Sequence, residues 1–233
     1  MNKPKTPATF VLIPGAGGVA QYWSRLGPLL EAEGHEVIAV DLPGDSEIEG
    51  LAAYADIVVR AIGERKGVVL VAQSMGGFTA PAVCARVPVK MVVLVNAMIP
   101  MPGETPGAWW GNTNSAAARI AAAKRGGYST EFEMFQYFLH DVPADVIKAG
   151  EKNQRQEAPV AFAEPALFKA WPTIPIHVVA SKGDRFFPLG FQIEIAKKRL
   201  GETVDEIDGG HLVALSNPED LARLLLGYLN QRG

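Results

Sequence analysis

The most regular feature of the chain is a series of short, continuous apolar runs separated by stretches with helical spacing. Strands that are apolar at every position have both faces covered, as in a parallel sheet packed between two helical layers. The runs predict buried strands at Phe10–Ile13, Val37–Val40, Val68–Val71, Met91–Val95, Ile176–Val179 and, more weakly, Thr203–Ile207.

The stretches between these runs predict amphipathic helices. Apolar residues recur every three or four positions over Leu51–Ile62 and again over Leu221–Leu229. The second of these helices has a clear start, with Asn217 as N-cap and Pro218 in the first turn. Alternating strands and helices predict an α/β fold with a doubly wound, mostly parallel sheet.

One interval, residues 98–170, interrupts this alternation. It is far longer than the dozen or so residues that a parallel crossover needs, and it contains no convincing core strand. We expect residues 1–97 and 171–233 to form the core of one domain, with the interval inserted into it as a helical lid over the strand ends. The alternative is a helical excursion that only pads the sheet.

The same interval carries helical signals of its own. Ser115–Lys124 predicts one helix, and a capping box at Thr130 and Glu133 predicts a second over Phe132–Leu139. The interval is also rich in aromatic residues, which are typical of an apolar substrate pocket. The residues that we expect to line such a pocket are Trp109, Trp110, Phe135 and Phe138.

The composition, 48% hydrophobic and 20% charged, is ordinary for a soluble protein with a substantial core. The net charge of −3 comes without a basic stripe, which argues against nucleic acid as a partner. The apolar runs are too short for a membrane span or a signal peptide. The single cysteine, Cys84, cannot form an internal disulfide, so we expect a cytoplasmic protein with a buried, inert thiol. Nothing in the sequence indicates an oligomeric state.

A candidate nucleophile follows the third apolar run. Val68–Val71 leads directly into Ala72-Gln73-Ser74-Met75-Gly76-Gly77, and a helix rich in small residues comes next. A serine on so sharp a strand-to-helix turn projects its hydroxyl above the sheet edge, beside the free N–H groups of the helix. The turn requires small neighbours, which Ala72, Gly76 and Gly77 supply.

A serine nucleophile needs a base, and the position of one histidine suits that role. His35 follows a glycine in a turn, His177 lies within an apolar strand, and His140 lies in the interval 98–170. His211 comes just beyond the last strand, on a loop that can reach the serine. The four histidines are scattered, so we expect neither a metal site nor a cofactor.

The residue that orients the base is expected at the end of the preceding strand, where Asp184 stands. The order Ser74, Asp184, His211 is the order of nucleophile, acid and base in this architecture. Asp208 competes for the acid role, but its place three residues before His211 favours a hydrogen bond within the loop. An exposed turn aspartate is the structural alternative for Asp184.

The first strand ends in Pro14-Gly15-Ala16-Gly17-Gly18. A glycine-rich turn allows a backbone N–H group to approach a substrate oxyanion without a Cβ in the way. We therefore expect the oxyanion hole to consist of the N–H groups of Ala16 and Met75.

Together these motifs resemble the α/β-hydrolase superfamily across nearly the whole chain. The chain is most similar to the small esterases related to plant methylesterases and hydroxynitrile lyases. The resemblance implies a Ser–Asp–His mechanism that cleaves a small carboxylic ester or lactone through an acyl-enzyme on Ser74. The motifs that carry it are Pro14-Gly15-Ala16-Gly17, Asp41-Leu42-Pro43-Gly44, Gln73-Ser74-Met75-Gly76-Gly77, Gly183-Asp184 and Gly209-Gly210-His211.

The chain departs from the family pattern at several positions. Pro14 replaces the histidine that usually precedes the oxyanion glycine, and Ala72 replaces the first glycine of the elbow. The related lyases carry a lysine directly after the triad histidine and a threonine in place of Gly15. Leu212 and Gly15 therefore point away from lyase chemistry.

Two other functions fit parts of the sequence. Gly15–Ala20 matches the G-x-G-x-x-A pattern of dinucleotide-binding domains, and Asp41 follows as a ribose ligand would. An NAD(P)-binding oxidoreductase is therefore one alternative, although it leaves Ser74, Asp184 and His211 without a joint explanation. A hydrolase fold that serves as a non-catalytic receptor for a small molecule is the other.

Overall fold

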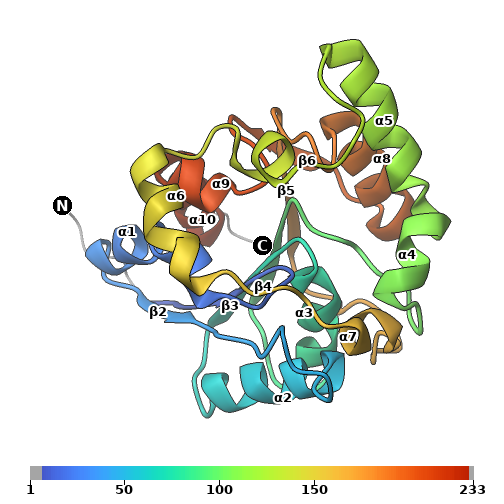
Figure 1. Ribbon diagram of the computed structural model, residues 1–233. Helices are drawn as coiled ribbons and strands as arrows, with labels where there is room; N and C mark the ends of the chain where they lie inside the picture. Colours follow the sequence, from blue (N-terminus) through green and yellow to red (C-terminus); the bar gives the residue numbers. More distant parts are fainter. Residues whose placement is uncertain (1–6, 231–233) are drawn as a thin grey trace.

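The computed structural model describes residues 7–230 and is built around a parallel sheet (Figure 1). The strand order is β2-β1-β3-β4-β5-β6, and every pair of neighbours is parallel. The strands are β1 (Thr9–Ile13), β2 (Glu36–Ala39), β3 (Val68–Gln73), β4 (Met91–Val95), β5 (Ile176–Ser181) and β6 (Val204–Ile207). The predicted doubly wound, mostly parallel sheet is confirmed.

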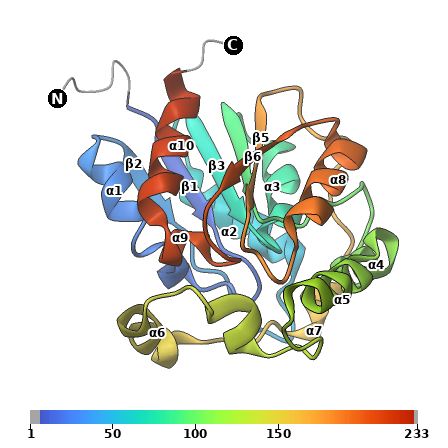
Figure 2. The ribbon, with the colours of Figure 1, turned by 90° about the horizontal axis from the view of Figure 1, so that it is seen from above.

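Alternate residues of the central strands pack into two separate hydrophobic clusters, one on each face of the sheet. Val11 and Ile13 of β1 pack in one cluster, whereas Phe10 and Leu12 of the same strand pack in the other. Figure 2 shows the sheet between its two helical layers. The first cluster is covered by α2 (Leu51–Ile62), α3 (Gly76–Cys84) and α8 (Leu189–Leu200), and the second by α1 (Gly27–Ala32) and α10 (Pro218–Asn230).

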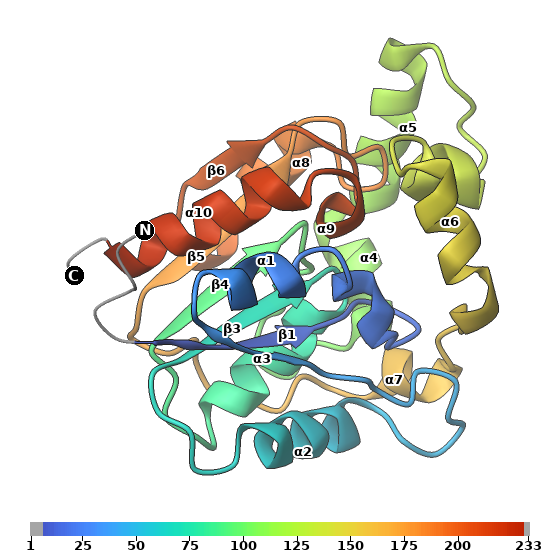
Figure 3. The same cartoon turned by 90° about the vertical axis from the view of Figure 1, so that its left-hand side faces the viewer.

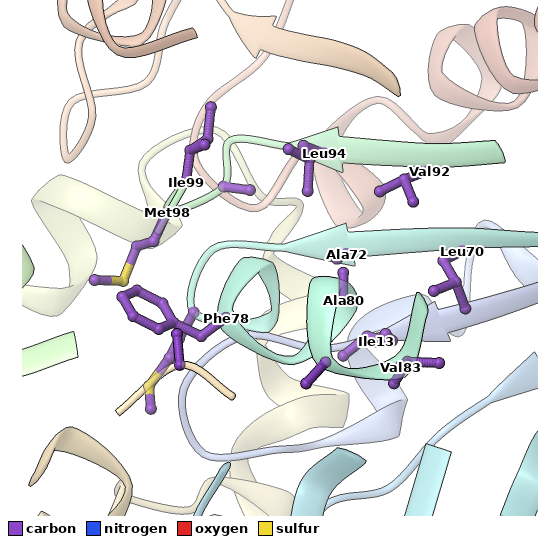
Figure 4. Packing of buried hydrophobic residues seen from close by; sticks show 14 of the residues in the cluster. Ile13, Leu70, Ala72, Phe78, Ala80, Val83, Val92, Leu94, Met98 and Ile99 are labelled. Atoms are coloured by element: carbon purple, nitrogen blue, oxygen red, sulfur yellow. The ribbon is translucent and has the colours of Figure 1, made fainter. Parts of the chain in front are cut away.

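The edge strands explain why the apolar signal weakens at the two ends of the sheet. β2 and β6 each pair on one side only, and their side chains are largely exposed or half-buried. β1, β3 and β4 are buried at every position. Helix α3 is buried along nearly its whole length, and Figure 4 shows its Ala80 lying over Ala72 of β3. Small side chains are required at such a close approach of helix and strand.

The interval between β4 and β5 is helical. We refer to residues 98–170 as the β4–β5 segment, which Figure 3 shows beyond the carboxyl ends of the strands. It comprises α4 (Pro106–Thr113), α5 (Ser115–Gly126), a π-helical turn (Phe135–Leu139), α6 (Ala144–Gly150), a 3-10 turn (Glu151–Asn153) and α7 (Pro159–Ala163). The remaining short helices of the described chain are a 3-10 turn at Ala20–Trp23 and α9 (Val213–Ser216).

The predicted capping box at Thr130 and Glu133 is wrong. The helical conformation begins only after Glu133, and the regular part is the π-helical turn. The lead-in is held in a non-helical conformation because Arg119 donates to the carbonyl of Thr130, while the Tyr137 hydroxyl donates to that of Ser129. Tertiary hydrogen bonds therefore override the local capping signal.

A buried ion pair fastens the β4–β5 segment to the core. Glu104, just before α4, accepts two hydrogen bonds from the Arg199 guanidinium of α8, at 2.5 and 3.0 Å. The two side chains are 5% and 7% exposed. Asn112 and the backbone N–H of Met101 also donate to the Glu104 carboxylate. Each oxygen of this buried carboxylate therefore accepts two hydrogen bonds.

Among residues 7–230, no helix combines the length and apolar character that crossing a membrane requires.

Candidate active site

Ser74 lies on the sharp turn between β3 and α3, in the left-handed region at φ 49°. Such a conformation is rare for a residue with a side chain and marks a functional strain. A Cβ on Gly76 would lie 2.6 Å from the carbonyl oxygen of Pro14, and one on Gly77 would lie 2.0 Å from that of Met98. The predicted requirement for small residues beyond the serine therefore has a direct steric cause.

The three predicted catalytic side chains meet in one hydrogen-bonded line. The Ser74 Oγ lies 3.1 Å from His211 Nε2, and His211 Nδ1 lies 2.8 Å from Asp184 Oδ2. All three residues are buried: Ser74 is 8% exposed, His211 1% and Asp184 4%. Since they come from the ends of β3 and β5 and from the loop after β6, the sheet topology alone brings them to one edge.

The Asp184 carboxyl group is held in place by hydrogen bonds at both of its oxygens. Its Oδ1 accepts the backbone N–H groups of Phe186 and Phe187, at 2.8 and 2.9 Å, which leaves Oδ2 for the imidazole. The competing acid Asp208 instead forms an exposed ion pair with Lys182 at 2.7 Å. Its side chain therefore pairs with the loop after β5, rather than within its own loop as expected, and Asp184 is the acid that contacts His211.

Two buried amides support the His211 loop, and the sequence reasoning missed both. Asn96, directly after β4, places its Nδ2 3.1 Å from the carbonyl oxygens of Gly210 and His211, and its Oδ1 accepts the N–H of Ser181. Gln73 Nε2 also lies 3.3 Å from the His211 carbonyl. Asn96 is fully buried at φ 46°, and a polar residue at the end of an apolar strand was the available signal.

The glycine-rich turn after β1 lies against the elbow. A Cβ on Gly15 would lie 2.9 Å from the Cβ of Ser74, and the turn is closed by a hydrogen bond from Gly18 N–H to the Gly15 carbonyl. Ala16, on this turn, lines the same cavity as Ser74. Within residues 7–230, the N–H groups of Ala16 and Met75 donate to no protein acceptor.

A cavity of about 400 Å³ opens beside Ser74 and His211. Its walls are mostly apolar and come from the β4–β5 segment on one side and from the loops of the core on the other. The apolar side chains that line it include Phe138, Leu139, Val142, Val146, Leu212 and Leu215. A cavity of this size and lining is typical of a small-molecule site.

Of the four aromatic residues expected in the pocket, the structure places Phe138 there and the other three elsewhere. Trp109 is fully buried in the core, where it packs on Phe187 at 5.3 Å and donates its indole N–H to a backbone carbonyl. Trp110 packs on Phe186, and Phe135 is 66% exposed. The expectation for Trp109, Trp110 and Phe135 is therefore wrong, because these side chains join helices or face solvent.

The structure does not favour the dinucleotide interpretation of the same turn. The space in front of Gly17 is filled by the carbonyl oxygen of Arg155, 2.4 Å from where a Cβ would lie. Asp41, the expected ribose ligand, accepts hydrogen bonds from Arg155 at 2.6 Å and from the Ala20 N–H at 3.0 Å. The turn also leads into a short 3-10 turn, whereas pyrophosphate binding uses the start of an α-helix.

Cys84, at the end of α3, is a free thiol, and burial raises its pKa to about 12. It is therefore protonated at neutral pH, as expected for an inert thiol. In the described part of the chain, no three His, Cys, Asp or Glu side chains are grouped so that they could hold a metal ion.

Fold and site together define a hydrolase in which a serine is activated by a histidine. The sequence matches the alpha/beta hydrolase family over residues 10–224, so the protein belongs to this family. Methylesterase 3 of Arabidopsis thaliana is 26% identical, over 99% of both chains. The alpha-hydroxynitrile lyase of the same plant is 25% identical, over 91% of this chain and 93% of the lyase.

Among solved structures, polyneuridine aldehyde esterase superposes with a TM-score of 0.79 at 22% identity, over 97% of this chain and 100% of the esterase. The resemblance predicted from the sequence motifs is therefore confirmed at the level of family and fold.

Proposed function

We propose that this protein is a serine hydrolase that cleaves a small carboxylic ester or lactone through an acyl-enzyme on Ser74. The observation that carries the proposal is the unbroken line from Ser74 Oγ through His211 to Asp184, at 3.1 and 2.8 Å, beside an apolar cavity. The similarity of this chain to methylesterase 3 supports an ester as the substrate.

In the first half of the reaction, His211 Nε2 accepts the proton of Ser74 as Oγ attacks the substrate carbonyl carbon. Asp184 accepts a hydrogen bond from Nδ1–H, which fixes the tautomer that leaves Nε2 free and stabilises the imidazolium. The N–H groups of Ala16 and Met75 donate to the oxyanion of the tetrahedral intermediate. The intermediate collapses when the bond to the leaving alcohol breaks and His211 protonates the alcohol.

In the second half, His211 takes a proton from water, and the resulting hydroxide attacks the acyl carbon. Breakdown of the second tetrahedral intermediate returns the proton to Ser74 Oγ and releases the carboxylic acid. A lactone follows the same course, with the alcohol and acid remaining on one product.

The β4–β5 segment acts as the lid of this site, above a core of residues 1–97 and 171–233. Phe138 supplies the aromatic wall, and Leu212 presents an apolar side chain directly after the triad histidine. This lining favours an apolar acyl or alcohol group of modest size.

The test is turnover of p-nitrophenyl esters of increasing chain length, with lactones and thioesters assayed in parallel. We expect turnover of the shorter esters, and Ser74→Ala should lower kcat by about 10⁶, the scale seen when a triad serine is removed. Retention of turnover in folded Ser74→Ala protein would refute the proposal. Tight ligand binding without turnover by the unmodified protein would favour a receptor instead.

A further inference from the structure

Two carboxylates of the β4–β5 segment reach the loops that carry the base and the oxyanion donor. Asp141 accepts the N–H of Gly210, the residue before His211, and Glu157 accepts the N–H of Gly17, the residue after Ala16. We propose that Asp141 and Glu157 are positioning residues, through which this segment sets the geometry of the active site. The inference rests on the function proposed above and extends it.

The contact at the base is close because Gly210 has no side chain. The Gly210 N–H donates to Asp141 Oδ2 at 2.5 Å, and a Cβ on Gly210 would lie 2.5 Å from the other carboxylate oxygen. That second oxygen is buried and has no hydrogen-bond partner among the described residues. A buried, half-satisfied carboxylate is unfavourable for stability, so stability alone does not explain Asp141.

The contact at the oxyanion turn fixes one peptide plane. Glu157 Oε2 accepts the Gly17 N–H at 2.6 Å, and Oε1 accepts the hydroxyl of Tyr54 at 2.6 Å. Gly17 has φ 84°, and the Arg155 carbonyl closes the space beside it. The peptide group between Ala16 and Gly17 is therefore restrained by a hydrogen bond and by a close contact, one peptide group away from the Ala16 N–H.

Burial raises the pKa of Glu157, whereas the hydrogen bonds from the Tyr54 hydroxyl and the Gly17 N–H act to lower it. A hydrogen bond from an N–H group to a carboxylate is about twice as strong as one between neutral groups. Both bonds thus couple a carboxyl side chain of the segment to a backbone amide that adjoins a site residue.

The segment also supplies a matched control. Glu164 accepts the N–H of Ala52 at 3.0 Å, which is the same kind of bond between a segment carboxylate and a core amide. Ala52 lies at the start of α2, which carries none of the proposed catalytic groups. Loss of the Glu164 bond reports the general effect of loosening the segment.

The experiment compares steady-state kinetics and melting temperatures of Asp141→Ala, Glu157→Ala and Glu164→Ala, with Asp141→Asn and Glu157→Gln as conservative variants. We expect kcat to fall about tenfold or more in Asp141→Ala and in Glu157→Ala, with little change in KM. Misplaced catalytic groups stabilise the transition state less while substrate binding is retained. The Asn and Gln variants retain an acceptor oxygen and should recover part of the loss. Glu164→Ala should keep kcat while its melting temperature falls.

Equal kcat in all three alanine variants of an active enzyme would overturn the inference and leave the proposed function intact. Absence of Ser74-dependent turnover in the unmodified protein would refute both.

A second measurement, by nuclear magnetic resonance, depends neither on turnover nor on the alanine variants. Amide proton signals of Gly17 and Gly210 in ¹⁵N-labelled protein should move in Glu157→Gln and Asp141→Asn respectively, each in its own variant only. Unchanged signals in both variants would also overturn the inference.

Discussion

The ring of Phe138 lies nearly parallel to the imidazole of His211, with centroids 4.8 Å apart and an interplanar angle of 20°. Phe186 and Phe187 approach the same imidazole edge-on, at 5.2 and 5.3 Å. The β4–β5 segment therefore contacts His211 directly, and the imidazole, enclosed by three aromatic rings, is almost fully buried.

Phe138→Ala is expected to lower kcat/KM by about two- to twelvefold, because an aromatic pair contributes roughly 0.5–1.5 kcal/mol beyond its buried area. The measurement is kcat/KM for the best p-nitrophenyl ester. Phe135→Ala is the matched control, since it changes an exposed residue of the same π-helical turn and should leave kcat/KM unaltered. Equal losses in the two variants would contradict a role for the stacked pair.

Asp184→Asn is expected to fold normally but to lower kcat by about 10⁴, because the amide no longer selects the tautomer with a free Nε2. Steady-state kinetics and circular dichroism test the two halves of this statement. Asp208→Asn provides the comparison, since Asp208 pairs with Lys182 at the surface and should tolerate the change. A larger loss in Asp208→Asn would reverse the assignment of the acid.

Gly77→Ala is expected to destabilise the protein by several kcal/mol or to prevent folding, on the scale of about 1–3 kcal/mol for overpacking and more when backbone must move. Its Cβ would lie 2.0 Å from the Met98 carbonyl oxygen. Gly227→Ala in α10, where nothing lies within 4 Å, should instead stabilise by up to about 1 kcal/mol. Denaturant unfolding measures both, and similar behaviour of the two variants would contradict the steric argument.

Glu104→Gln is expected to cost about 3–5 kcal/mol at neutral pH, because it leaves the buried Arg199 guanidinium without its counter-ion. Burial alone would raise the pKa of Glu104, but hydrogen bonds from Arg199, Asn112 and the Met101 N–H lower it below its ordinary value. The folded form thus binds the proton more weakly than the unfolded form.

The stabilisation by this carboxylate is therefore complete above the unfolded pKa, about 4.3, and is lost as pH falls through the lower folded value. Free energies of unfolding should differ by a constant amount between pH 6 and 8 and should converge in strong acid. A difference that does not change as pH falls below the unfolded pKa would show that the charge of Glu104 is not involved.

The strands and the meeting of Ser74, His211 and Asp184 were predictable because their signals are local. A continuous apolar run marks β3. The serine and glycines that follow it meet the requirement for small residues in a sharp strand-to-helix turn. His211 could be selected because it alone follows a strand end in the right order. The weaker prediction for β6 reflects its place at the edge of the sheet, where two of its four side chains are exposed.

The supports of the site were not predictable, because they depend on contacts between residues far apart in the chain. Asp141 and Gly210 are 69 positions apart, and Gly17 and Glu157 are 140 positions apart. Trp109 and Phe138 both belong to an aromatic-rich stretch, and only the packing of α4 against α8 decides which one reaches the cavity.

The high pKa of Cys84 has a practical use. Maleimide dyes react with thiolates, so the native thiol should react slowly at pH 7, whereas a cysteine introduced by Phe135→Cys would be exposed and reactive. A single fluorophore could then be attached to the exposed side of the π-helical turn without first removing the native cysteine. Its emission would report on the surroundings of the π-helical turn when a substrate is added.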